Sequence, residues 1–194
     1  NAIQNGEAIF SCSISFQKRE KGLNHQIKMP KIQGPEKLKS DLELRKDLQS
    51  KIPKDYLPMW LREREIETRQ VEPVDLLKAE KLPPYRSTWM KPTGKLPTDE
   101  RIHQALLLYV SDMGLLGAAV NPHEVNFMSK KFQSASLDHV MWFHGKVNFN
   151  NWILHHMHSP ISQNARGFSR GSIYTKSGKL IASTAQEGLM RIWD

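Results

Sequence analysis

The stretch 97-PTDERIHQALLLYVSDMGLLGAA-119 decides the fold of this chain. Thr98 is a suitable N-cap, and Asp99 and Glu100 follow it at the positive end of the helix dipole. From Ala105 to Val110 every residue is apolar or tyrosine. The sequence therefore predicts a helix that is apolar on all sides and must be enclosed by other elements.

Strand-like segments lie on both sides of this helix. The segments 62-REREIETRQV-71 and 85-YRSTWMKP-92 precede it, the first predicted as an exposed, charged strand. Four more follow, around residues 134–144, 152–158, 167–175 and 179–192, with Ser177-Gly178 as the turn between the last two. An antiparallel sheet curled round a single central helix, an α+β fold, satisfies this order.

The first 17 residues resemble the end of another structural unit. Asn5-Gly6 favours a tight hairpin turn, in which both positions need a positive φ. Residues 10–16 then alternate between large apolar side chains or Cys12 and serines, which predicts a half-buried strand. Because a lone hairpin is marginally stable in water, we expect these strands to complete a sheet whose other strands are absent from this chain.

The next segment is polar and basic. Between Lys18 and Asp55 there are eleven Lys or Arg against six Asp or Glu, out of a net charge of +8 for the chain. A helix with an incomplete apolar face is predicted between Pro35 and Pro53. Because this segment contains prolines and alternates in sign, we interpret it as an inter-domain connector rather than a DNA-binding face.

Composition narrows the functional classes further. A single cysteine, Cys12, excludes a disulfide framework and favours a reducing compartment. No apolar run approaches the roughly 20 residues that span a bilayer, and the N-terminus lacks a signal-peptide pattern, so we expect an intracellular protein without membrane insertion. We expect no nucleic-acid partner, whereas a modestly basic surface suits a phosphorylated ligand.

Histidine clusters suggest metal binding at first. Asp138, His139 and His144 form one group, and 155-HHMH-158 forms another. On a strand, however, His156 and His158 point to one side and His155 to the other. No cysteine supports either group and neither spacing matches a familiar zinc site, so we interpret these residues as hydrogen-bonded strand histidines.

Residues suited to covalent catalysis do not stand out. There is no Gly-x-Ser-x-Gly elbow and no glycine-rich phosphate loop after a strand. Three polar residues within apolar stretches remain, namely Asp112, Ser136 and Gln186. Asp112 could be solvated on an exposed last turn of the helix, or it could orient or deprotonate a water. Spacing alone does not single out these three residues.

Several ordered motifs resemble one family. The segments 103-HQALLLYVSDMGLL-116, 136-SLDHVMWFH-144, 165-ARGFSRGSIYTKSGKLIAST-184 and 185-AQEGLMR-191 are similar to the C-terminal half of acyl-CoA thioesterase II, the TesB-type double-hotdog family. The segment 4-QNGEAIFSCSISFQ-17 resembles the closing strands of that family's first hotdog unit. The resemblance implies a hotdog fold, an antiparallel sheet wrapped round a central helix.

The resemblance also implies a domain organisation. Residues 1–17 would be the closing strands of an incomplete first hotdog unit, residues 18–56 a connector with a helix, and residues 57–194 the second hotdog unit. Family members commonly extend hotdog sheets side by side, which implies a homo-oligomer, a dimer or tetramer. We expect a cytoplasmic location; the alternative is peroxisomal, if the true C-terminus carries a targeting tripeptide beyond 191-RIWD-194.

The activity that the resemblance implies is hydrolysis of acyl-CoA to free fatty acid and CoA, without a covalent intermediate. Asp112 would be the general base for a water that Ser136 and Gln186 hold in position, and no metal or redox cofactor would be needed. Asp138 and His139 would hold the strand and the neighbouring backbone in place. The oxyanion donors are not identified, and a backbone N–H is expected.

Two other functions stay open at this point. The chain could be a hotdog module that binds acyl-CoA or a partner chain without turnover. It could also be a hotdog hydratase that uses Asp138 and His139 as an acid–base pair. The hydratase hypothesis predicts that His139 is essential and Gln186 is not, which is the reverse of the thioesterase hypothesis.

Overall fold

An antiparallel sheet dominates the computed structural model, which describes residues 1–75, 77–127 and 129–193. Strands β3 (Ile66–Gln70), β4 (Tyr85–Pro92), β7 (Ile153–Gln163), β8 (Arg166–Thr175) and β9 (Leu180–Ile192) lie side by side in that order. Strands β5 (Phe132–Ser136) and β6 (Val140–Phe143) both pair with β9 on its other side. The predicted antiparallel sheet is confirmed, and strand 85–92 has its predicted bounds. The single strand predicted around residues 134–144 is instead two strands, β5 and β6, and the strand predicted as exposed, β3, is buried at Ile66 and half-buried elsewhere.

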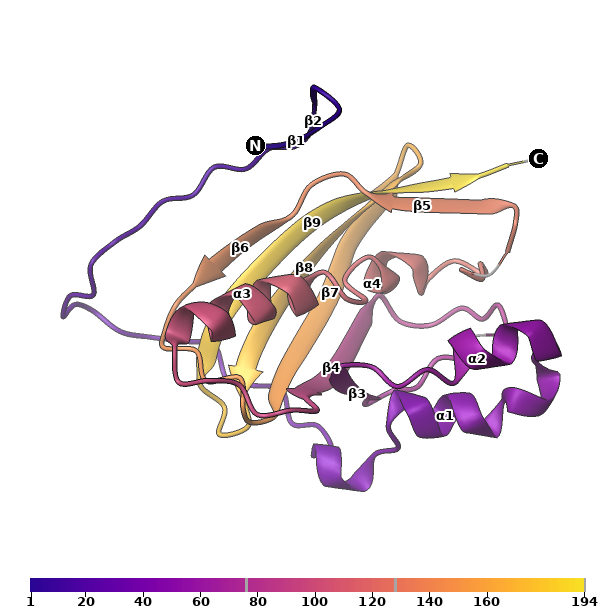
Figure 1. Ribbon diagram of the computed structural model, residues 1–194, viewed down its shortest axis with the longest axis horizontal. Coiled ribbons are helices and arrows are strands. Elements are labelled where there is room, and N and C mark those ends of the chain that lie inside the picture. The colour runs from indigo at the N-terminus through magenta and orange to yellow at the C-terminus, as the bar shows by residue number, and fades with distance from the viewer. Residues whose placement is uncertain (76, 128, 194) are drawn as a thin grey trace.

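Helix α3 (Glu100–Ser111) lies across one face of the curled sheet, as Figure 1 shows. It begins one residue later than predicted, because its N-cap is Asp99, whose carboxylate accepts a hydrogen bond from the backbone N–H of Arg101 at 3.0 Å. Leu107 and Val110 face the sheet with no exposed surface. They form the main core together with Phe149, Ile153, Ile173 and Ile181 among others. Each such aliphatic side chain contributes about 1.5–3 kcal/mol by leaving water.

The opposite face of α3 corrects the prediction of an enclosed helix. Tyr109 is 65% exposed and Leu108 is 46% exposed. A single sheet covers only one side of a helix, and among the described residues no element lies over the other side. The prediction followed the apolar character of residues 105–110 and could not tell which side of the helix this chain covers by itself.

A second short helix extends this inner layer. Helix α4 (Gly117–Val120) is buried at every position, and Leu115 and Ala118 pack with Met157 of β7. Gly178 has a φ of +89° in the tight turn between β8 and β9, where the hairpin was predicted. Across the three described ranges of the chain, no helix is both long and apolar enough to span a bilayer.

The outer face of the sheet is covered by the polar segment before β3. Trp89, Leu154 and Tyr174 form a second core cluster on this face. Met29, Ile32 and Leu38 pack against that cluster. The indole N–H of Trp89 donates to the carbonyl of Gln33 at 2.9 Å. Residues 29–38 are therefore attached to the back of the sheet, and only part of the predicted connector is solvated.

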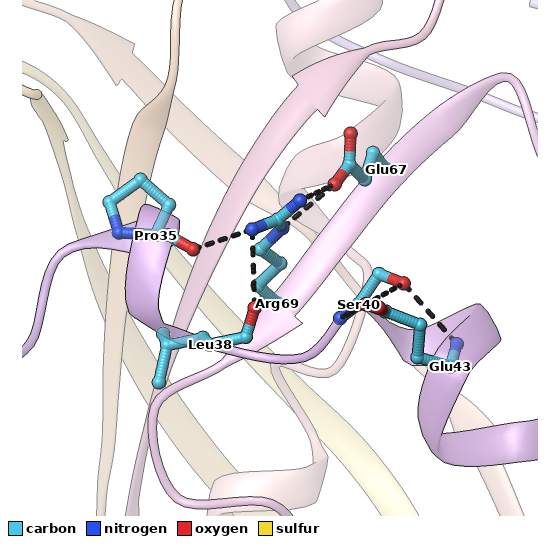
Figure 2. Close-up of polar contacts among 6 residues, drawn as sticks. All are labelled: Pro35, Leu38, Ser40, Glu43, Glu67 and Arg69. Carbon is cyan, nitrogen blue, oxygen red and sulfur yellow. Dashed lines mark hydrogen bonds and ion pairs between the residues drawn. The ribbon is translucent and has the colours of Figure 1, made fainter. Parts of the chain in front are cut away.

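The predicted helix between Pro35 and Pro53 is present as shorter pieces: η1 (Pro35–Lys37), α1 (Asp41–Asp47) and η2 (Gln49–Lys51), followed by η3 (Lys54–Tyr56) and α2 (Leu57–Trp60). Ser40 and Glu43 form a capping box that begins α1. Figure 2 shows this box and Arg69 of β3, which donates to the carbonyls of Pro35 and Leu38 at 2.7 and 3.1 Å. These bonds attach the helical segment to the first strand of the sheet.

The N-terminal residues form a separate hairpin of β1 (Ala2–Gln4) and β2 (Glu7–Phe10). Its turn is the predicted one, with φ of +51° at Asn5 and +83° at Gly6. In Figure 1 the hairpin stands apart from the main sheet at the end of an extended segment. The strand predicted for residues 10–16 is wrong beyond Phe10, and Phe16 is 92% exposed. A strand needs a neighbouring ladder, and none of the described residues supplies one here.

Candidate active site

Asp112 caps the C-terminal end of α3, directly after the buried Ser111. Strand β9 passes this end of the helix and carries Gln186, and β5 ends at Ser136, which pairs with Gly188 of β9. The sheet register therefore brings toward Asp112 two side chains that lie 24 and 74 residues away along the chain.

The structure brings the three predicted site residues into contact. The hydroxyl of Ser136 donates to Oδ1 of Asp112 at 3.2 Å. The side-chain amide of Gln186 donates a short hydrogen bond to the same oxygen. Asp112 thus receives two donors on one oxygen, and its Oδ2 is the oxygen that neither bond uses.

Burial differs sharply across this trio of Asp112, Ser136 and Gln186. Gln186 is 1% exposed, whereas Asp112 and Ser136 are exposed to solvent. A carboxylate held by two donors from the protein and open on one side can accept a proton from a water molecule. The arrangement has the geometry of a general base with two positioning groups.

Asp138 ties the turn between β5 and β6 to the strand that carries Gln186. Its Oδ1 accepts from the backbone N–H of Glu187 at 2.8 Å, and the N–H of Leu137 donates to the carbonyl of Glu187 at 2.9 Å. Asp138 therefore connects the backbone of the turn between β5 and β6 to the backbone of β9, next to Gln186.

His139 supports the other side of the trio. Its Nε2 lies 2.8 Å from Oγ of Ser111, and that hydroxyl donates to the carbonyl of Leu108 at 2.7 Å. Both contacts are satisfied together when the Ser111 hydrogen goes to that carbonyl and the imidazole donates from Nε2. Burial lowers the pKa of His139, although Asp112 and Asp138 act in the opposite direction.

Asp138 and His139 hydrogen-bond to different partners and not to each other. Each of the two side chains is therefore engaged with the protein on its own side of the trio. The contacts agree with the predicted holding role of both residues. Sequence patterns did not single out Ser111, the residue that connects His139 to the helix. Its position directly before Asp112, on the buried face of α3, is the signal that could have identified it.

His144, His155 and His156 each have a separate partner. His144 contacts Ser183, and His156 contacts Ser87 on the outer side of the sheet. His155 faces the opposite way, as strand alternation predicts, and is fully buried with Nε2 3.3 Å from Oγ1 of Thr184. Within residues 1–75, 77–127 and 129–193, no three His, Cys, Asp or Glu side chains gather as a metal-binding group.

A glycine makes room for the buried histidine. A Cβ at Gly171 would lie 2.1 Å from Nε2 of His155 and 2.4 Å from Oγ1 of Thr184. Burial lowers the pKa of His155 from 6.5 to about 3, with smaller contributions from His139 and His156. The ring is therefore neutral near pH 7.

This burial predicts a pH-dependent stability. Because the folded-state pKa of His155 lies below its unfolded value, its contribution to stability is complete above pH 6.5 and is lost as the pH falls toward about 3. We expect about 1.4 kcal/mol of unfolding free energy to be lost per pH unit in that window. The unfolding free energy is measured by urea unfolding at several values between pH 7 and pH 4. His155→Gln should reduce the change of this free energy per pH unit. His158→Gln, at an exposed position on the same strand, should leave that change as it is in the parent. An equal slope in His155→Gln and the parent would contradict this assignment.

Two hollows in the structure lie away from the trio. The larger, of about 450 Å³, lies between α1 and residues 70–75. The smaller, of about 210 Å³, lies near His123 and the turn between β7 and β8. Neither contains Asp112, Ser136 or Gln186. Asp112 and Ser136 lie at an open surface, and Leu137, the residue after Ser136, is an exposed apolar side chain there.

Comparison with known proteins gives a consistent result. The family model described as "Acyl-CoA thioesterase" matches residues 60–189. The acyl-CoA thioesterase 2 of Haemophilus influenzae is 35% identical over 98% of this chain and 66% of its own length. The acyl-coenzyme A thioesterase 8 of Mus musculus is 34% identical over 98% of this chain and 62% of its own length. The chain thus spans about two thirds or less of these relatives.

Solved structures agree on the architecture. The acyl-CoA thioesterase II TesB2 from Mycobacterium marinum has a TM-score of 0.68 and 29% identity, covering 91% of this chain and 60% of that one. A protein with a hot dog fold from Alicyclobacillus acidocaldarius has a TM-score of 0.61 at 14% identity, covering 90% of this chain and 58% of that one, which bears on the fold alone. The predicted hotdog fold is confirmed.

Proposed function

Because the chain belongs to the acyl-CoA thioesterase family, we propose that it hydrolyses acyl-CoA thioesters to a free carboxylic acid and CoA. The observation that carries the proposal is the pair of hydrogen bonds that converge on Oδ1 of Asp112 from Ser136 and Gln186. This cluster combines a carboxylate, two donors and access to solvent.

In the proposed reaction the nucleophile is a water molecule. Asp112 uses Oδ2 to take a proton from that water as a general base. The water oxygen forms a bond to the thioester carbonyl carbon, the C–S bond breaks, and the CoA sulfur leaves and takes up the proton. Oxygen, sulfur and proton balance without a covalent enzyme intermediate.

Ser136 and Gln186 have two tasks in this mechanism. Each donates one hydrogen bond to Asp112, which fixes the carboxylate plane. The lone pairs of the Ser136 hydroxyl and the second amide hydrogen of Gln186 remain to hold the water. Fixing both partners before reaction removes part of the entropic barrier of bringing them together.

Assembly is a further part of the proposal. Tyr109 and Leu108, on the uncovered side of the helix that ends at Asp112, are 65% and 46% exposed. Exposed apolar side chains of this size favour contact with another protein surface. We propose that this face is covered in a homo-oligomer or by a further hotdog unit, which would supply the wall along which the acyl chain lies.

The direct test is thiol release from acyl-CoA substrates with acyl chains from C4 to C16. The proposal predicts release above the spontaneous rate for at least part of this panel, with one free acid formed for each thiol. Binding of acyl-CoA without any release would contradict the proposal and would make the chain a binding module.

A further inference from the structure

The Gln186 amide is paired on one side only. Its NH2 group donates to Asp112, but its Oε1 is buried and accepts no hydrogen bond from any described residue. An amide held at one end can rotate, and a rotated amide would point its oxygen at the Asp112 carboxylate. The trio therefore needs a donor that fixes the Oε1 end.

Ser169 of β8 is the neighbour best placed to be that donor. It stands directly opposite Gln186 in the β8–β9 ladder, so both side chains point to the same face of the sheet. Residues paired in this way have Cβ atoms about 4.5–5.5 Å apart. Ser169 is fully buried, and its Oγ likewise has no partner within the described part of the chain.

The chemistry of the two groups is complementary. A serine hydroxyl can rotate and donate, and an amide oxygen accepts. Two other buried atoms lack partners among the described residues, Nδ1 of His139 and Nδ1 of His155. When His139 carries its proton on Nε2, its Nδ1 can only accept a hydrogen bond, so it cannot donate one to Oε1 of Gln186. His155 lies on β7 and reaches across β8 with its Nε2, which contacts Thr184 of β9 and not Gln186.

The two atoms make no hydrogen bond to each other in the structure as it stands. We propose that Ser169 is a positioning residue whose hydroxyl donates to Oε1 of Gln186 after a side-chain rotation or through one bridging water. This contact keeps the NH2 group turned toward Asp112. The consequence for catalysis rests on the proposed hydrolase function, whereas the contact itself does not.

The contact can be tested without activity. In the ¹⁵N-labelled chain, the side-chain NH2 signals of Gln186 are identified by their loss in Gln186→Ala. Ser169→Ala should shift these signals and accelerate their exchange with solvent. Ser172→Ala is the matched control, because Ser172 lies on the same strand and faces the other side of the sheet. Unchanged Gln186 signals in Ser169→Ala would overturn the proposal.

A kinetic cycle then tests the role in turnover. Ser169→Ala should lower kcat about fivefold with little change in KM, the scale of one neutral hydrogen bond. In a Gln186→Ala background the same substitution should have no further effect. An equal loss in both backgrounds would overturn the positioning role. If the parent released no thiol while Ser169→Ala still shifted the Gln186 signals, the hydrolase function would fail and the contact would stand.

Discussion

Replacing Asp112 by asparagine is expected to lower kcat for thiol release by about a hundredfold or more, the scale for loss of a general base. The amide has nearly the same shape and can still accept hydrogen bonds from Ser136 and Gln186, but it cannot take a proton from water. The measurement is the steady-state rate of CoA release with the preferred acyl chain length, together with circular dichroism to verify the fold.

Asp99→Asn is the matched control for this variant. Asp99 sits at the other end of the same helix and acts as its N-cap, a role that asparagine also fills. Its kcat should stay close to that of the parent. If Asp112→Asn released thiol as fast as the parent, Asp112 would not be the base, and the activation of water would have to come from another group.

The second large effect separates the thioesterase from the hydratase hypothesis. Gln186→Ala removes a hydrogen bond to a charged group and should lower kcat about ten- to hundredfold. His139→Ala removes only the neutral bond to Ser111 and should cost about two- to tenfold. Both are measured as thiol release from the same substrate.

The opposite ranking would favour hydratase chemistry. In that case His139→Ala would abolish turnover and Gln186→Ala would be tolerated. The substrate would also differ, because a hydratase adds water to an α,β-unsaturated acyl-CoA and leaves the thioester intact. Loss of the double-bond absorbance without free thiol would therefore identify the hydratase directly.

Local patterns predicted the sheet well. Strand 85–92 and the turns at Asn5-Gly6 and Ser177-Gly178 follow from alternation and from residues that accept positive φ, which are local properties. The helix at residues 100–111 follows from its cap and apolar run. The elements that pack against a helix or pair with a strand were harder to predict. One side of α3 is exposed, and the residues after Phe10 are unpaired, because this depends on which other elements are present. Local patterns do not contain that information.

The candidate site could not be deduced from spacing. Asp112 and Gln186 meet only because β9 runs past the end of α3, and Ser136 joins them only through the β5–β9 register. The resemblance to known motifs identified these residues before their contacts were visible. Ser111 and Ser169 were missed, because each acts on a neighbour whose position depends on the folded sheet and helix.

The central claim is that Asp112, Ser136 and Gln186 act as one unit on a water molecule. The most direct measurement is kcat for thiol release by the double variant Asp112→Asn with Gln186→Ala, compared with the two single variants. Residues that work as a unit show strongly non-additive losses, so we predict that the double variant is no slower than Asp112→Asn alone. If the two losses multiplied instead, the residues would act independently, and the single water-activating unit would be ruled out.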